Sequence, residues 1–371
     1  MDKQSYKRLG GYIRAVDVRN RELQCSNLLG LSIAKKFIPS IANTIGTDLS
    51  TYKIVQNKQF AYVPVTSRNG DKITIALYNG KEDCIVSQAY TVFEIADTKQ
   101  LLPEYLMMWF QRPEFDRYAR FKSIGSAREV FDWNEMCDVL IPLPSVAEQE
   151  KIVSQHQAIE NRINTNETLV YKLEETAIAI YKNMFVENID TENLPDGWKK
   201  GVLSDVAKII MGQSPDGESL NTKGDGIIFY QGKTDFGFRF PSVRMFTTAP
   251  KKYAAEGDIL ISVRAPVGDI NIAQNKCSIG RGLASVSPKF GANSYVYYLL
   301  KFLYPEFNKY NGEGEGTVFG SINGEALNNM EIIVPTRAMF ELYNSKVSPI
   351  DNHISLLLKE IEVLKKALKI L

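Results

Sequence analysis

The chain contains few of the residues that build metal centres and disulfide frameworks. Its 371 residues include two histidines and four cysteines, and no two cysteines are close enough to form a C-x-x-C pair. Zinc sites need clustered cysteine and histidine ligands, and disulfide frameworks need many paired cysteines in a short secreted chain. We therefore expect reduced, buried thiols and no metal site.

Long apolar runs are also missing. No stretch approaches the roughly 18 consecutive apolar residues that identify a membrane span, and the segment that follows Met1, Asp-Lys-Gln-Ser-Tyr-Lys-Arg8, is polar. The sequence predicts a soluble, cytoplasmic protein that does not contact a membrane.

An excess of charge of one sign is absent as well. The 44 lysines and arginines nearly balance the 43 aspartates and glutamates, which gives a net charge of +1. This balance alone does not indicate a nucleic-acid partner. Hydrophobic residues make up 44% of the chain, enough for ordinary cores, and the length suggests two or three domains.

An internal repeat is the clearest positive feature. Pro113-Glu-Phe-Asp-Arg-Tyr118 recurs 192 residues later as Pro305-Glu-Phe-Asn-Lys-Tyr310, with four of six residues identical. Residues 5–190 and 199–371 therefore form two copies of one unit, and a missed repeat of this kind would misassign the whole fold. The polar stretch 187–198 is the linker between the copies.

Each copy begins with a β-rich part. In the first copy the apolar segments 60–65 and 73–77 flank a turn, and in the second copy residues 258–263 precede the turn Gly268-Asp269. A short helix is expected next, at about 103–120 and about 293–309. An apolar strand then ends at Pro142 or Pro335. This pattern predicts one α+β domain that is made twice.

The second part of each copy is a heptad helix. The apolar a and d positions of the two helices are expected to pack against each other through Ile152, Ile159, Ile163, Asn166, Val170 and Leu173 of the first and Ile350, Ile354, Leu357, Ile361, Leu364 and Leu368 of the second. Asn166 is the polar a position, which we interpret as a register-fixing residue. His156, at a d position, is interpreted as a packing residue.

Symmetry predicts the arrangement of the helices. Two equivalent domain–helix units that bury the same stripe do so most simply about a two-fold axis, which makes the helices antiparallel. The first helix, from residue 152 to 184, is roughly 50 Å long. A rod of this length separates two domains by somewhat more than one DNA turn, which is about 34–36 Å. The helices are therefore expected to act as a ruler between two DNA-reading domains.

The charge balance differs between segments. Residues 1–142 contain 19 basic and 16 acidic residues, and residues 194–335 contain 15 and 14. Residues 143–193 contain 4 basic and 9 acidic residues, a net charge of −5. The acidic helix is suited to binding protein, whereas the mildly basic domains can read bases where cations and amides cluster.

We expect the DNA-contacting side chains to be polar residues in or near turns. They are Arg19, Asn20, Arg21, Lys35, Lys36, Ser67, Arg68, Asn69 and Arg128 in the first copy, and Gln213, Ser214, Gln231, Lys233, Asp235, Arg239, Arg264 and Arg281 in the second.

With these features in place, the sequence resembles the specificity subunit of type I restriction–modification systems over its full length. The most specific similarity is Ile141-Pro-Leu-Pro-Ser-Val-Ala-Glu-Gln-Glu-Lys-Ile152, which resembles the family's spacer signature. Gly212-Gln-Ser-Pro-Asp216, Tyr230-Gln-Gly-Lys-Thr-Asp-Phe-Gly237 and Gly280-Arg-Gly-Leu-Ala284 support it. The second spacer, from Val334, departs from the signature.

The resemblance implies a domain order and a set of partners. It implies target recognition domain 1 at residues 1–143, spacer helix 1 at 144–190, target recognition domain 2 at 191–335 and spacer helix 2 at 336–371. Each domain would read half of a split, asymmetric site in double-stranded DNA. The helices would dock two methyltransferase subunits and recruit the restriction and translocase subunits. S-adenosylmethionine, ATP and Mg²⁺ are then expected on those partners, with no cofactor on this chain.

Two enzymatic functions require sequence patterns that this chain does not have. A methyltransferase would need an Asn/Asp-Pro-Pro-Tyr/Phe loop and a glycine-rich cofactor loop, and a nuclease would need a metal-binding carboxylate pair followed by lysine; these patterns are absent from the sequence. We therefore expect a non-catalytic subunit. The remaining alternative is a coiled-coil scaffold protein whose globular ends bind protein.

Overall fold

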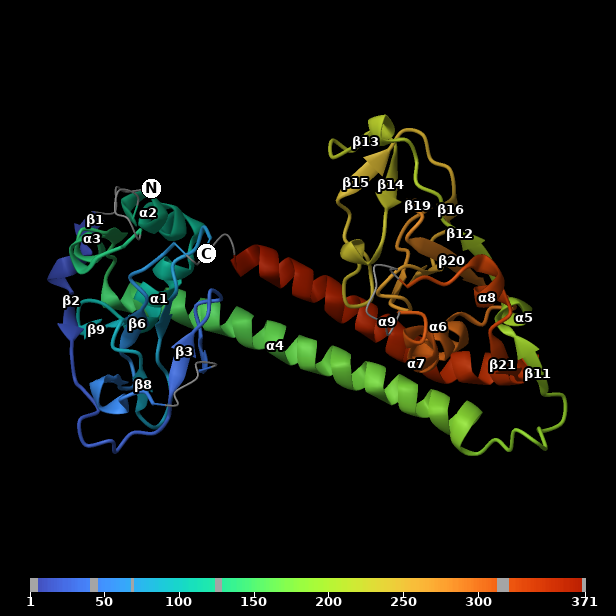
Figure 1. The fold of residues 1–371 in the computed structure, drawn as a ribbon, viewed down its shortest axis with the longest axis horizontal. Coiled ribbons are helices and arrows are strands. Elements are labelled where there is room, and N and C mark those ends of the chain that lie inside the picture. Colours follow the sequence, from blue (N-terminus) through green and yellow to red (C-terminus); the bar gives the residue numbers. More distant parts are fainter. Residues whose placement is uncertain (1–5, 41–45, 68–69, 124–128, 312–319, 369–371) are drawn as a thin grey trace. The chain divides into compact units, whose positions relative to one another are not determined.

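The structure is a computed structural model that describes residues 6–40, 46–67, 70–123, 129–311 and 320–368. The chain divides into two compact units. Unit 1 comprises residues 1–162 and 366–371, and unit 2 comprises residues 163–365. Figure 1 shows the elements of both units.

Unit 1 is built on a four-stranded antiparallel sheet. The strands lie in the order β2-β9-β6-β7, with bounds β2 (Ile13–Val16), β6 (Phe60–Tyr62), β7 (Ile75–Leu77) and β9 (Thr91–Ile95). Three further antiparallel pairs are β1 (Tyr6–Arg8) with β10 (Leu140–Pro142), β3 (Leu29–Leu31) with β4 (Phe37–Pro39), and β5 (Lys53–Val55) with β8 (Cys84–Val86). The helices are α1 (Pro103–Gln111), α2 (Pro113–Ser123), α3 (Trp133–Cys137) and the first part of α4 (Val146–Lys182).

Aromatic side chains hold the core of unit 1 together. Phe60 on β6 stacks on Phe93 of β9 with ring centroids 4.8 Å apart, and Phe110 of α1 contacts both rings edge-on. Burial of such rings is a large part of a domain's apolar stabilisation. Helix α1 is thereby fixed on the sheet.

Unit 2 repeats the same plan. Its four-stranded sheet has the order β12-β20-β17-β18, with bounds β12 (Ala207–Met211), β17 (Ile259–Ser262), β18 (Ile270–Ile272) and β20 (Leu283–Pro288). The pair β11 (Lys199–Val202) with β21 (Glu331–Val334) corresponds to β1 with β10. A five-stranded sheet contains β13 (Leu220–Asn221), β15 (Met245–Thr247), β14 (Ile227–Tyr230), β19 (Cys277–Ile279) and β16 (Tyr253–Ala254). The helices are the second part of α4, followed by α5 (Leu203–Val206), α6 (Asn293–Phe302), α7 (Tyr304–Asn308), α8 (Gly324–Asn328) and α9 (Arg337–Leu368).

The strand orders confirm the internal repeat. The hairpin β6–β7 corresponds to β17–β18, as the sequence predicts, and β3–β4 corresponds to β14–β15. The copies differ in their loops: residues 63–74 join β6 to β7, whereas the shorter segment 263–269 joins β17 to β18. The conserved sheets therefore carry loops of different length and sequence.

One sequence expectation about the helices was wrong. A single helix was expected at about 103–120, but the chain forms α1 and α2 with Arg112 between them in an extended conformation, at φ −71° and ψ 142°. Pro113 causes the break, because proline disfavours helical geometry at the preceding residue. The equivalent region of unit 2 is likewise divided into α6 and α7.

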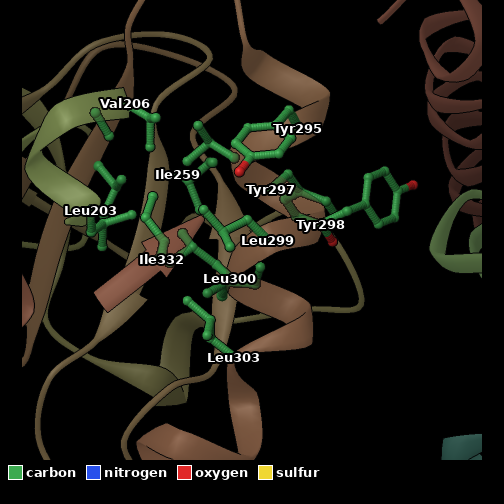
Figure 2. Packing of buried hydrophobic residues seen from close by; sticks show 14 of the residues in the cluster. Leu203, Val206, Ile259, Tyr295, Tyr297, Tyr298, Leu299, Leu300, Leu303 and Ile332 are labelled. Atoms are coloured by element: carbon green, nitrogen blue, oxygen red, sulfur yellow. The ribbon is translucent and has the colours of Figure 1, made fainter. Parts of the chain in front are cut away.

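The core of unit 2 lies between its sheet and α6. Figure 2 shows Tyr295, Leu299 and Leu303 beside Leu203 and Ile259, all of them buried. The C-terminal end of α4 joins this core through Tyr181, and the π-helical segment that follows it, Asn183–Glu187, joins through Phe185. Burial of this kind contributes about 25 cal/mol per Å² of apolar surface, so the helix end is a structural part of the domain.

The long helices bury residues at heptad spacing within unit 2. The buried positions of α4 in unit 2 are Ile163, Asn166, Val170, Glu174, Ala177 and Tyr181, and those of α9 are Phe340, Tyr343, Val347, Ile354, Leu357 and Ile361. The other predicted contact positions, Ile152, Ile159, Leu173, Ile350, Leu364 and Leu368, are half-buried. The buried residues of α9 all lie at predicted a and d positions, and those of α4 do so except Glu174 and Tyr181, which directly follow a positions.

Contacts between α4 and α9 follow one order along unit 2. Tyr343, early in α9, donates to the carbonyl of Ala177 at 3.0 Å, whereas Lys365, late in α9, pairs with Glu167 at 2.7 Å. Residue numbers rise along one helix as they fall along the other. In unit 2 the two helices thus run in opposite directions.

The described residues contain neither a helix that could span a membrane nor a cluster of metal ligands. None of the helices they form is long and apolar enough to cross a membrane. Among the same residues, no three His, Cys, Asp or Glu side chains come together as a metal site.

Candidate nucleic-acid interface

Four loops of unit 2 meet where strands β12, β14 and β17 end. The N–H of Gly212 donates to the carbonyl of Leu283 at 2.9 Å, and the N–H of Gly280 donates to the carbonyl of Tyr230 at 2.8 Å. The N–H of Val263 donates to the carbonyl of Gly282 at 2.9 Å. Residues 212–214, 230–233, 263–264 and 279–283 therefore form one surface, which we call the unit 2 loop cluster.

Glycines allow these loops to approach one another. A Cβ on Gly282 would lie 2.6 Å from the carbonyl oxygen of Gln231, and a Cβ on Gly280 would lie 3.1 Å from the Cα of the same residue. Any side chain at Gly282 would clash with backbone. The structure thus gives these glycines a packing role inside the protein.

The cluster presents polar side chains to solvent. Gln213, Gln231, Arg264 and Arg281 are exposed, and neither guanidinium pairs with a carboxylate among the described residues. The Ser214 hydroxyl accepts a hydrogen bond from the N–H of Arg281 at 3.2 Å, so it orders the loop that carries that arginine. Five of the residues selected from the sequence therefore lie together on a well-ordered surface.

Lys233 and Asp235 have partners within the protein. The exposed Lys233 ammonium pairs with Asp269 at 2.6 Å. Asp235 is buried, accepts from the N–H of Gln231 at 2.8 Å and pairs with Arg244 at 2.5 Å. The expectation that Asp235 contacts DNA is corrected: its carboxylate is used to hold the loop that presents Gln231.

The expectation that Arg239 contacts DNA is also corrected. Its side chain is 2% exposed and pairs with Asp351 of α9 at 2.5 Å, so it cannot reach a base. Sequence reasoning does not select Asp351 or its neighbour in space, Glu174, because each lies beside an apolar heptad position and not at one, and a charged residue is ordinary there. The signal that could find them is an acid directly after an a position in both helices.

The predicted DNA-contacting residues of unit 1 differ in their exposure. Arg21, Lys36 and Ser67 are exposed, and Arg19 is half-buried, with its guanidinium donating to the carbonyl of Thr51 at 2.7 Å and pairing with Asp17. Arg68, Asn69 and Arg128 lie outside the described residues. The segment around Ser67 corresponds in the fold to that of Arg264, since Val65 bridges Val130 as Arg264 bridges Ser321.

Two unit 1 candidates are buried, which corrects their assignment as DNA contacts. The Asn20 side chain is 2% exposed and bonds both backbone groups of Cys25. The Lys35 ammonium pairs with Asp116 of α2 at 2.8 Å, and burial lowers its pKa although Asp116 opposes the shift. Both side chains are satisfied within the protein and hold loops in place.

The fold and the loop clusters together define a class of protein. This class comprises proteins built from a duplicated α+β domain, with different polar loops on each copy and a long helix after each. The comparisons with known proteins place the chain within that class.

Residues 30–175 and 195–366 match the family of type I restriction modification DNA specificity domains, Methylase_S. The chain therefore belongs to this family, and the sequence resemblance is confirmed. Each copy of the repeat is covered by one of the two matched segments.

Individual relatives agree with the family assignment. The chain is 28% identical over 339 residues to the MjaX type I restriction enzyme specificity subunit of Methanocaldococcus jannaschii, covering 87% of this chain and 78% of that protein. It is 25% identical to a chain from a structural study of complex assembly and conformational transition in the type I R-M system, with a TM-score of 0.51 and coverage of 98% and 95%. The type I S subunit from M. genitalium, 12% identical over 100% and 96% of the two chains, shares the fold with a TM-score of 0.62.

Proposed function

We propose that this chain is the DNA-reading subunit of a type I restriction–modification complex and that each copy of the repeat reads one half of a split, asymmetric target. The observation that carries the proposal is the duplicated sheet with dissimilar loops. Equivalent scaffolds would place two reading surfaces in equivalent ways, and different side chains on them would select different bases.

The exposed side chains of the unit 2 loop cluster suit base recognition in the major groove. Arginine binds guanine O6 and N7 in a bidentate manner, and glutamine binds adenine N6 and N7. Arg264 and Arg281 would read guanines, and Gln213 and Gln231 would read adenines. In unit 1, Arg21, Lys36 and Ser67 are the exposed candidates for the other half-site. No catalytic step is assigned to this chain.

The two long helices would form an antiparallel coiled coil about a pseudo-two-fold axis, and its length would set the gap between the half-sites. Heptad burial on both helices and their opposed directions in unit 2 support this arrangement. Residues 144–190 and 336–371 would be the spacers, and residues 1–143 and 191–335 the recognition domains.

A second stripe on α9 supports docking of the methyltransferase subunits. Leu342, Pro349, Leu356 and Val363 recur every seven residues on this helix and are exposed, with Leu356 65% exposed and Val363 64%. An unpartnered apolar stripe at heptad spacing is suited to packing against another helix. Two methyltransferase subunits would dock here and on the acidic first spacer, and the restriction and translocase subunits would join them in the cytoplasm.

Under this proposal the chain itself needs no cofactor. S-adenosylmethionine, ATP and Mg²⁺ would bind to the partner subunits, which carry out methylation and translocation. The modest charge of the recognition domains implies weak DNA binding by this subunit alone, because phosphate contacts supply most of the affinity of such complexes.

The experiment that tests the proposal is selection from a random duplex pool with the chain bound to its methyltransferase subunits. We expect salt-dependent binding and enrichment of a motif with two different defined halves and a fixed gap. Failure to enrich a gapped motif with the partner present would instead favour a scaffold protein with protein-binding ends.

A further inference from the structure

Arg239 lies in a loop of unit 2 that connects the reading surface to the long helices. The loop follows the cluster residues 230–233 and precedes β15. Its position is fixed on the sheet side, because the N–H of Ile272 in β18 donates to the carbonyl of Arg239 at 2.8 Å and the Asn271 amide bonds both backbone groups of Gly237. On the helix side, Phe238 packs edge-on against Tyr171 of α4, with the two ring centroids 4.9 Å apart.

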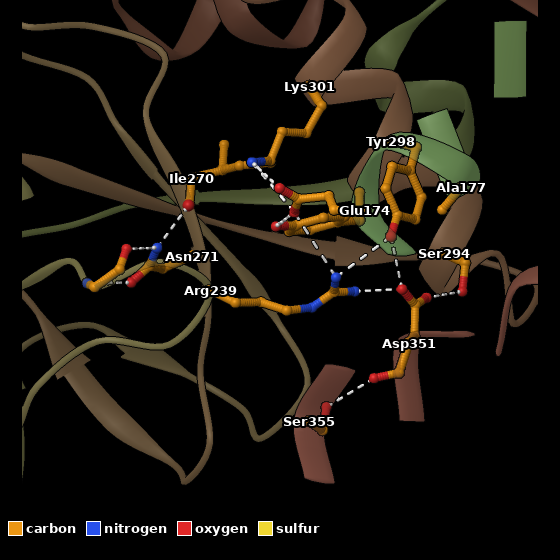
Figure 3. Close-up of polar contacts among 12 residues, drawn as sticks. Glu174, Ala177, Arg239, Ile270, Asn271, Ser294, Tyr298, Lys301, Asp351 and Ser355 are labelled. Carbon is orange, nitrogen blue, oxygen red and sulfur yellow. Dashed lines mark hydrogen bonds and ion pairs between the residues drawn. The ribbon is translucent and has the colours of Figure 1, made fainter. Parts of the chain in front are cut away.

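The guanidinium of Arg239 joins both helices (Figure 3). One nitrogen donates to Asp351 Oδ1 of α9 at 2.5 Å. The other is 3.9 Å from Glu174 Oε1 of α4 and donates to the Tyr298 hydroxyl at 3.3 Å. The guanidinium also lies over the Tyr297 ring, 4.4 Å from its centroid. One buried cation thus contacts α4, α6 and α9.

The two carboxylates are in turn oriented by α6. Asp351 accepts from the hydroxyls of Ser294 at 2.6 Å and Tyr298 at 2.8 Å. Glu174 accepts from the Tyr297 hydroxyl at 3.2 Å and pairs with Lys301 at 3.4 Å. The two cations, Arg239 and Lys301, and the two carboxylates therefore have most of their hydrogen bonds satisfied. A buried ion pair requires such partners. A buried polar network of this kind favours one arrangement of its parts over others.

Unit 1 makes a different use of the equivalent position. Lys35, in the β3–β4 hairpin that corresponds to β14–β15, is also buried, but its partner Asp116 belongs to α2 of the same domain and not to a long helix. Arg239 thus links a loop to both long helices, whereas the Lys35–Asp116 ion pair does not.

We propose that Arg239 is a positioning residue, which fixes the orientation of the unit 2 loop cluster on α4 and α9 and thereby restricts the gap that the protein accepts. The proposal rests on the proposed function. Arg239 does not contact DNA, and the bases that each half reads do not depend on it. Removing its guanidinium leaves Glu174 and Asp351 without their shared cation and lets the loop cluster shift on the helices.

The test uses the chain assembled with its methyltransferase subunits and duplexes that carry both half-sites with gaps that differ by single base pairs. The readout is the ratio of methylation at the native gap to that at one base pair more or less. For Arg239→Met we expect unchanged half-sites and a ratio lowered by about tenfold or more, since a displacement on the order of 1 Å can change such rates about 100-fold. Arg239→Lys, which keeps the charge but not the planar fork, should give an intermediate ratio.

Lys35→Met is the matched control, because it removes a buried cation of unit 1 that does not touch a long helix. It should lower the melting temperature and leave the ratio unchanged. If Arg239→Met does not assemble, Asp351→Asn carries the same expectation with little change in size. An unchanged ratio in the Arg239 or Asp351 variants, or an equal fall in Lys35→Met, would overturn the positioning role. A wild-type complex without any gap preference would overturn the proposed function as well.

Discussion

At the scale of single residues, Cys84 on β8 and Cys277 on β19 occupy equivalent strands of the two copies and are fully buried. Burial raises the pKa of each thiol to about 12. Cys25 and Cys137 are only half-buried. The expectation of buried thiols thus holds for two of the four cysteines.

This difference predicts the reactivity and the alkaline stability of the protein. At pH 8, iodoacetamide followed by mass spectrometry should label Cys25 and Cys137 before Cys84 and Cys277.

Because the folded Cys84 and Cys277 thiols keep their protons above the ordinary pKa of 9.0, the folded state binds more protons than the unfolded state. The free energy of unfolding should therefore fall as pH rises from 9 towards 12. Denaturant unfolding at pH 8 and pH 10 measures this loss, which should be smaller in the double variant Cys84→Val and Cys277→Val. Equal labelling of all four thiols would contradict the predicted difference in reactivity.

The packing of Gly282 leads to a second residue-scale prediction. Gly282→Ala should destabilise unit 2 by about 1–3 kcal/mol, because the added methyl group meets the carbonyl of Gln231 and must displace a loop. Thermal unfolding measures the loss. Gly217→Ala is the control, since nothing lies within 4 Å of its Cβ and its φ is not positive. Similar melting temperatures for the two variants would contradict the packing role.

At the scale of elements, the long helices were the most predictable part of the fold. Apolar residues at heptad spacing identify the buried face without reference to any partner, and Ile163, Val170 and Leu357 are buried as expected. The loop cations were not predictable, because burial of a lysine or arginine depends on distant residues. Asp351, the partner of Arg239, is 112 residues away in sequence. Local sequence shows that a loop is polar, but not which of its polar groups point inward.

Asn166 provides a test of the helix pairing. Its side chain is 1% exposed and its Nδ2 has no hydrogen-bond partner among the described residues. A buried unpaired donor costs about 1–3 kcal/mol, so Asn166→Leu should raise the melting temperature while broadening the accepted gap. Asn164→Leu, on the exposed face of α4, should do neither. If Asn166→Leu stabilised the protein but left the gap selectivity unchanged, Asn166 would have no register role and would only lower the stability.

The exposed stripe on α9 predicts the effect of charge at the docking surface. Leu356→Glu combined with Val363→Glu should abolish co-purification with the methyltransferase subunits, because two carboxylates would be buried without partners in the interface. The melting temperature of the isolated chain should hardly change, since both side chains are exposed. Lys359→Glu, also exposed on α9, controls for added charge. If the double variant still co-purified with the methyltransferase subunits, these subunits would have to dock on another surface.

At the scale of the whole molecule, the near-zero net charge results from segments of opposite sign. Residues 143–193 carry a net charge of −5, and the segments 1–142, 194–335 and 336–371 carry +3, +1 and +2. The repeat, visible at residues 113–118 and 305–310, predicted two equivalent domains, and the strand orders agree with it. What the repeat could not predict is how the copies differ, because those differences lie in the loops between conserved strands.

The central claim is that each copy reads one half of a bipartite target, and base-resolution mapping of the methylated motif tests it most directly. Cells that carry the complete system with Arg264→Ala and Arg281→Ala should methylate a motif in which one half is degenerate, while the other half and the gap match the wild type. Each lost bidentate contact should cost about 1–3 kcal/mol of base discrimination. A motif altered in both halves, or in neither, would contradict the assignment of one half-site to each copy.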